Sequence, residues 1–119
     1  MIGVIDYGLG NIKAFVNLYN RENIPVKVIS NPKDFVDITK LILPGVGAFD
    51  HAMGLFNNSG LKSNVQELVL QKRVPVLGIC VGLQIMAEKS DEGSLSGLGW
   101  IKAAVEKIPI TNLANNTHL

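Results

Sequence analysis

Apolar residues form four short runs, at positions 2–5, 26–29, 41–43 and 74–79, separated by segments in which apolar residues recur every three or four positions. Short runs rich in valine and isoleucine predict strands, and the three-to-four spacing predicts amphipathic helices. Strands that alternate with helices are typical of parallel sheets joined by crossover helices. We therefore predict an α/β fold, mainly a parallel sheet flanked by helices, and expect residues 1–119 to belong to a single domain.

The helix signals are clear enough to place the elements. Asn11 is a good N-cap for a helix that runs to about Asn20, and Pro25 then precedes the second strand. We expect further helices at 50–56 and at 61–71. The apolar positions of the helix at 61–71 have core-facing spacing and are Leu61, Val65, Leu68 and Val69. A last helix follows Cys80 and carries Leu83, Ile85, Met86 and Ala87.

Composition excludes several classes of function. Every apolar run is far shorter than the roughly 20 residues that span a bilayer, so we expect no membrane segment. The N-terminus enters a strand directly and has no secretory signal pattern, which favours a cytoplasmic protein. The 11 basic and 10 acidic residues form no long basic cluster, which argues against nucleic-acid binding.

Cys80 is the only cysteine, and it lies between Gly78 and Gly82 where a predicted strand turns into a helix. A single cysteine cannot form an internal disulfide, and no second thiol or histidine is spaced to bind a metal. A sharp turn from strand to helix exposes a side chain at the end of a sheet, where neighbouring amides stabilise a thiolate. The alternative is ordinary packing, because free cysteine behaves as a small apolar residue.

Two glycine-rich loops follow other strands and should reach the same edge of the sheet as Cys80. Gly8 and Gly10 do not form a dinucleotide motif, because Lys13 stands where the third glycine is required and Glu22 is a poor match for the ribose acid. Two interpretations of this loop remain open, a tight turn between strand and helix and a role in binding or docking. The loop at 44–47 is either an ordinary turn or, beside a nucleophile, a source of amide donors for an oxyanion.

The segment at 78–84 reads Gly-x-Cys-x-Gly-x-Gln, which resembles the class I, or triad, glutamine amidotransferases. The loops at 6–11, 43–49, 90–93 and 97–99 narrow the resemblance to glutaminase subunits of imidazole glycerol phosphate synthase. It covers the chain from Met1 to about Val105. The resemblance implies a flavodoxin-like fold and no cofactor or metal.

In this family a cysteine attacks the side-chain amide of glutamine, releases ammonia and leaves a glutamyl thioester, which water hydrolyses. By correspondence, the site would consist of Cys80 as the nucleophile, Gly45, Val46, Gly47 and Val81 around the oxyanion, and Gln84 and Glu92 on the substrate. A carboxylate at Glu92 is chemically suited to the α-ammonium group of glutamine. Without the resemblance, Glu92 would be read as a solvated loop charge.

The resemblance also implies a partner, a TIM-barrel synthase (cyclase) subunit that forms a heterodimer with the glutaminase and uses its ammonia in histidine biosynthesis. Tyr7 and Asn11 would lie at this interface. A second interpretation keeps the glutaminase but delivers ammonia to amidate a surface sugar. A third, non-enzymatic interpretation is an inactive docking remnant.

The chain departs from the family pattern mildly at Ala14 and Leu83, and severely in its histidines. The family takes a catalytic histidine and glutamate from a His-x-Glu segment that has no counterpart in this sequence. Neither His51, at the start of a predicted helix, nor His118, near the last residue, fits that segment. We therefore expect a C-terminally truncated chain with little glutaminase turnover on its own; sustained ammonia release that Cys80→Ser abolishes would contradict this.

Overall fold

The computed structural model describes residues 1–108 and contains a four-stranded parallel sheet. Its strands are β1 (Ile2–Ile5), β2 (Val26–Ile29), β3 (Lys40–Leu43) and β4 (Val76–Gly78), in the order β2-β1-β3-β4. Every neighbouring pair is parallel, so all four carboxyl ends meet at one edge. The predicted α/β class is confirmed.

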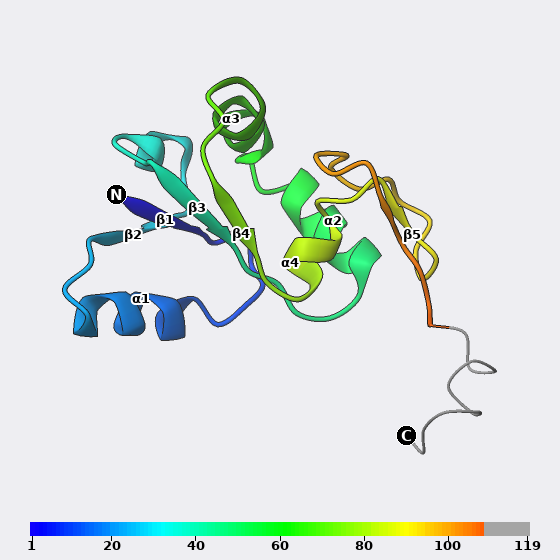
Figure 1. Cartoon of the computed structure of the whole chain (residues 1–119), viewed down its shortest axis with the longest axis horizontal. Helices are drawn as coiled ribbons and strands as arrows, with labels where there is room; N and C mark the ends of the chain where they lie inside the picture. The colour runs from blue at the N-terminus through cyan, green and yellow to red at the C-terminus, as the bar shows by residue number, and fades with distance from the viewer. Residues whose placement is uncertain (109–119) are drawn as a thin grey trace, which may run out of the picture.

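Helices cover both faces of this sheet. Figure 1 shows α1 (Ile12–Arg21) on one side and α3 (Lys62–Gln66) on the other. α3 continues into a π-helical turn, η2 (Glu67–Gln71), which divides the single helix predicted at 61–71. α2 (Phe49–Asn57) and the short α4 (Val81–Gln84) lie at the carboxyl edge of the sheet.

The start of α1 follows from its N-cap. The side-chain oxygen of Asn11 accepts a hydrogen bond from the N–H of Ala14 at 3.3 Å, which satisfies one of the amides that a first helical turn leaves free. The helix is amphipathic but none of its residues is fully buried. Its apolar stripe therefore packs only partly against β1 and β2.

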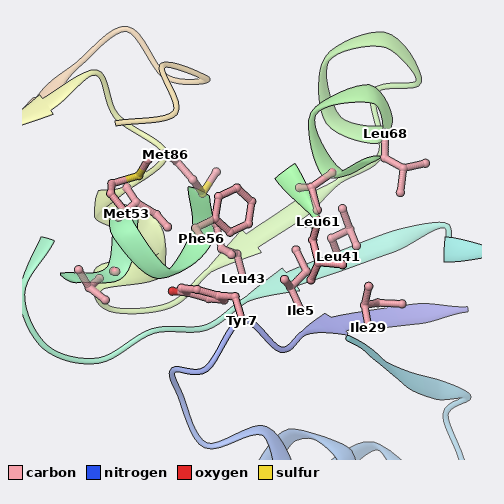
Figure 2. Packing of buried hydrophobic residues seen from close by; sticks show 14 of the residues in the cluster. Ile5, Tyr7, Ile29, Leu41, Leu43, Met53, Phe56, Leu61, Leu68 and Met86 are labelled. Atoms are coloured by element: carbon pink, nitrogen blue, oxygen red, sulfur yellow. The ribbon is translucent and has the colours of Figure 1, made fainter. Parts of the chain in front are cut away.

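The core lies between the sheet and the α2–α3 face. Figure 2 shows Tyr7 and Phe56 in contact, and their rings meet edge to face with centroids 5.6 Å apart. Phe56 is completely buried, and side chains from β1, β3, α2 and the helix after Cys80 pack around it. The largest buried side chains of this core include Ile5, Ile29, Leu41, Leu43, Phe49, Met53, Leu61, Val65 and Ile85.

The strand before Cys80 is not buried, although its continuous apolar run is typical of a buried strand. β4 pairs only with β3 among the described residues, and Leu77 at its centre is 55% exposed. An apolar cavity of about 240 Å³ lies beside it, lined in part by Tyr19, Leu41 and Pro75. A continuous apolar run indicates that a strand is suited to burial on both faces, but it does not show that both faces are covered.

Short elements escaped the sequence analysis. η1 (Pro32–Phe35) is a single 3-10 turn, and β5 (Lys89–Ser90) pairs in parallel with β6 (Ala104–Val105) in a second, small sheet. These segments contain no run of apolar residues like those that predicted the strands of the main sheet. His118 lies outside the described residues. Within residues 1–108, no helix has the length and apolar character needed to cross a bilayer.

The carboxylate of Asp34 should make stability depend on pH. It accepts hydrogen bonds from the N–H groups of Ser30 and Asn31, at 3.0 and 2.9 Å, which lower the pKa of Asp34 below its ordinary 3.8. Because the folded pKa is the lower one, this contribution is complete above the ordinary value and is lost as pH falls through the folded value.

We predict that Asp34→Asn lowers the melting temperature at neutral pH. The difference from the unmodified protein should shrink as pH falls below about 4, where the native carboxylate is also protonated. Thermal unfolding followed by circular dichroism between pH 2 and pH 7, which brackets the ordinary carboxyl range, measures this. A difference that stays constant over the whole range would contradict the assignment.

Candidate active site

Three loops meet at the carboxyl edge of the sheet, as the sequence predicted. The loop after β1 contacts the loop after β3, because the Tyr7 hydroxyl donates a hydrogen bond of 2.6 Å to the Pro44 carbonyl. Gly10 lies so close that an added Cβ would be 2.8 Å from the Cβ of Pro44. The loop after β3 in turn packs on the turn that carries Cys80.

The turn at Cys80 has a strained backbone. Cys80 has φ 56° and ψ −126°, a conformation that side-chain-bearing residues rarely adopt. A Cβ on Gly82 would collide with the carbonyl oxygen of Leu43, and a Cβ on Gly78 would come within 2.6 Å of the Leu83 Cα. The two flanking glycines therefore allow the chain to reverse against the end of β3.

This turn presents Cys80 to solvent. The cysteine is exposed, and its carbonyl accepts hydrogen bonds from the N–H groups of Leu83 and Gln84, which begin α4. Val81, the next residue, is the first of α4, so its N–H has no acceptor within the helix. The side chain of Val81 is buried and anchors the turn in the core.

The loop at 44–47 lies against this turn. A Cβ on Gly45 would come within 2.7 Å of Val81 Cγ1 and 2.9 Å of the Gly82 nitrogen. The structure thus brings Gly45 and Val81 together, two of the residues expected around an oxyanion. Val46 is 56% exposed, and Gly47, with φ 93°, has no described heavy atom within 4 Å of a built Cβ. Packing therefore restrains only the first half of the loop.

The two predicted substrate residues share a cavity. Gln84 on α4 and Glu92 in the loop after β5 are both exposed and line a space of about 310 Å³ together with residues 105–108. Cys80 does not line this cavity, but it precedes Gln84 by one helical turn. The nucleophile therefore lies at the N-cap of the short helix that ends at Gln84, and Glu92 lies in the neighbouring loop.

Tyr7 has a different environment from the one expected of an interface residue. It is only 5% exposed, and burial raises the pKa of its hydroxyl to about 12. Its observed role is to support the loop at 44–47 through Pro44. Asn11 is exposed, although its side chain also caps α1. His51 is exposed on α2, as expected for a surface histidine.

The sequence analysis missed Asp50, the second residue of α2. One carboxylate oxygen accepts hydrogen bonds from the N–H and hydroxyl of Ser94, and the other from the N–H of Leu95. These bonds lower the pKa of Asp50, the Ser94 N–H having the largest effect. An aspartate in a first helical turn is a helix signal, but nothing in the sequence links it to a loop 44 residues away.

Among residues 1–108, no group of three or more metal-binding side chains is present.

Comparisons with known proteins show the family and the fold of the chain. The sequence profile of the glutamine amidotransferase class-I family matches residues 3–114. The chain is 55% identical over 107 residues to "Imidazole glycerol phosphate synthase subunit HisH" of Bdellovibrio bacteriovorus, covering 90% of this chain and 52% of that protein. It is 46% identical to the protein of the same name from Leptospira interrogans, with the same coverage. The chain spans about half the length of these curated relatives.

A solved structure supports the fold independently. The chain titled "Crystal structure of glutamine amidotransferase" superimposes with a TM-score of 0.71 at 21% sequence identity. The match covers 88% of this chain and 55% of the other. The likeness establishes the shared fold, in which the Cys80 turn stands at the carboxyl edge of a parallel sheet.

Two glycine-to-alanine variants should separate close packing from simple helix propensity. Gly82→Ala places a methyl group against the Leu43 carbonyl, so we expect it to cost about 1–3 kcal/mol of unfolding free energy. Gly54→Ala adds the same methyl within α2, where no described heavy atom lies within 4 Å, and should stabilise by about 0.5–1 kcal/mol. Urea denaturation measures both; equal effects would refute this account of the turn.

Proposed function

The chain belongs to the class I glutamine amidotransferase family, and we propose that it forms the glutamine-binding and nucleophile-bearing part of the glutaminase of an imidazole glycerol phosphate synthase. The observation that carries the proposal is the strained turn at Cys80, packed against the Gly45 loop. The names of the relatives support the use of the ammonia in imidazole glycerol phosphate synthesis and not in surface-sugar amidation.

The proposed reaction begins at the Cys80 sulfur. The thiolate attacks the side-chain amide carbon of glutamine, and a C–S bond forms while the carbonyl oxygen becomes negative; collapse of this tetrahedral adduct then breaks the C–N bond. The departing nitrogen takes up a proton and leaves as ammonia, a transfer that the family resemblance assigns to a histidine and glutamate pair. Water then hydrolyses the thioester to glutamate and restores the thiol. Exposure of Cys80 gives a substrate access to the nucleophile.

The negative oxygen that forms during the attack needs amide donors. We assign this role to the N–H of Val81 and to a peptide of the loop Gly45–Val46–Gly47. The support is geometric, because Gly45 packs on Val81 and the Val46–Gly47 half of the loop is exposed. A reorientation of one peptide at Gly47, whose positive φ suits glycine alone, would then complete the donor pair.

Recognition of glutamine is assigned to Gln84 and Glu92. Both line the cavity next to the Cys80 helix, and an exposed carboxylate at Glu92 matches the α-ammonium group of the substrate. A charge-assisted hydrogen bond of this kind contributes about 1.5–3 kcal/mol. This pairing distinguishes glutamine from simple amides that lack an α-ammonium group.

We further propose a cytoplasmic heterodimer with a TIM-barrel cyclase subunit that receives the ammonia. The relatives are named as subunits of a synthase, which supports a partner. Asn11 is exposed at the end of the first loop and is the residue we assign to direct contact. Tyr7, which is buried, would act through the Pro44 loop that it holds.

The reactivity of Cys80 tests this proposal. The purified chain should be alkylated by 6-diazo-5-oxo-L-norleucine, an electrophile with the α-amino and α-carboxyl groups of glutamine, and free glutamine should protect it. Iodoacetamide serves as the reference, because it alkylates thiols without resembling glutamine. Intact mass spectrometry over time gives both rates, and Cys80→Ser should remove both adducts.

Glu92→Gln is the matched variant. It should lower the ratio of the two rates about tenfold or more, because it removes the charge that pairs with the α-ammonium group. The iodoacetamide rate should not change. If glutamine does not protect the unmodified chain and the ratio is the same in both proteins, the site does not recognise glutamine and the proposed function is wrong.

A further inference from the structure

The loop that carries Glu92 is attached to α2 by one carboxylate. Asp50 accepts hydrogen bonds from the Ser94 N–H at 2.9 Å, the Ser94 hydroxyl at 3.2 Å and the Leu95 N–H at 3.0 Å. Two of the three donors are backbone amides, so the carboxylate fixes the path of the main chain as well as a side chain. The loop is thereby held two residues after Glu92.

Gly93 allows the main chain of this loop to lie close to the Asp50 carboxylate. A Cβ on Gly93 would collide with an Asp50 carboxylate oxygen and approach its Cγ within 2.9 Å. The carboxylate therefore lies directly against the main chain next to Glu92. On the other side of Glu92, its N–H donates to the Ser90 hydroxyl at 3.2 Å. Glu92 thus stands between two anchored points.

Asp50 also lies close to the oxyanion loop along the chain. α2 begins at Phe49, directly after the loop that contains Val46 and Gly47, and Asp50 is its second residue. The residues of α2 that are buried in the core are Phe49, Ala52, Met53 and Phe56. Asp50 is not one of them, so its hydrogen bonds serve the loop and not the packing of the helix.

We propose that Asp50 is a positioning residue that holds Glu92 where it binds the α-ammonium group of glutamine. The inference rests on the proposed function, since it presumes that Glu92 meets the substrate. In this proposal Asp50 acts through the loop at Ser94 and Leu95 and not by direct contact with glutamine. Its removal should therefore affect recognition of the substrate and leave the intrinsic reactivity of Cys80 unchanged.

The experiment compares rates of Cys80 alkylation by 6-diazo-5-oxo-L-norleucine and by iodoacetamide. Asp50→Ala should lower the ratio of the two rates about as far as Glu92→Gln does, with an unchanged iodoacetamide rate. The double variant Asp50→Ala/Glu92→Gln should have the same rate ratio as Glu92→Gln alone, because both substitutions remove the same interaction with the α-ammonium group. Ser94→Ala, which deletes only the hydroxyl donor, should have a smaller effect.

Asp34→Ala is the matched control. Its carboxylate also accepts two backbone N–H groups, but in the loop after β2, at Ser30 and Asn31. It should lower stability without changing the rate ratio. This separates loss of a loop-fixing carboxylate in general from loss of the one beside Glu92.

The outcomes distinguish the inference from the proposed function. If Glu92→Gln lowers the ratio and Asp50→Ala does not, or if Asp50→Ala slows both reagents equally, Asp50 does not position Glu92. If the unmodified chain shows no preference that depends on Glu92, the proposed function fails and the inference falls with it. Should Asp50→Ala not fold, Asp50→Asn and Ser94→Ala decide the matter, and wild-type ratios in both would overturn the inference.

Discussion

The candidate site depends on one close approach of backbone to backbone, between Gly82 and the carbonyl of Leu43 at the end of β3. Any side chain at position 82 would separate them. Because these backbones touch, α4 begins directly at the sheet edge. Cys80, the residue before α4, therefore lies in a sharp turn that leaves it exposed. The loop at Gly45 packs against the same turn. Nucleophile and oxyanion loop are therefore placed by a single packing constraint.

The strain in this turn is offset by the burial of side chains that directly follow it. A side-chain-bearing residue in a sparsely populated conformation costs on the order of 1–3 kcal/mol. Val81 and Ile85 are 3% and 0% exposed, and full burial of such side chains contributes about 1.5–3 kcal/mol each. The N–H of Ile79 also donates to the Leu43 carbonyl at 3.0 Å. The core thus holds Cys80 in a conformation that it would not adopt alone.

Local signals in the sequence predicted what local interactions decide. The strands, the cap at Asn11 and the turn at Cys80 were found because each is determined by neighbouring residues. The exposure of Leu77 was missed, because hydrophobicity measures suitability for burial and not the presence of a cover. The burial of Tyr7 and the bonds from Ser94 to Asp50 were missed because they join residues 37 and 44 positions apart.

The two halves of the site are held by different kinds of interaction. Cys80 and Gly45 are placed by apolar burial of the neighbouring side chains and by backbone contacts that exclude any side chain. The loop of Glu92 is held by the carboxylate of Asp50, a half-buried residue whose hydrogen bonds lie at the surface and are open to competition from water. Removing that carboxylate deletes no core side chain of α2, because the buried face of this helix is formed by Phe49, Ala52, Met53 and Phe56. Nucleophile and substrate loop are therefore held by separate primary contacts, and the backbone hydrogen bond from the Leu98 N–H to the Ile85 carbonyl, at 2.7 Å, joins the two halves.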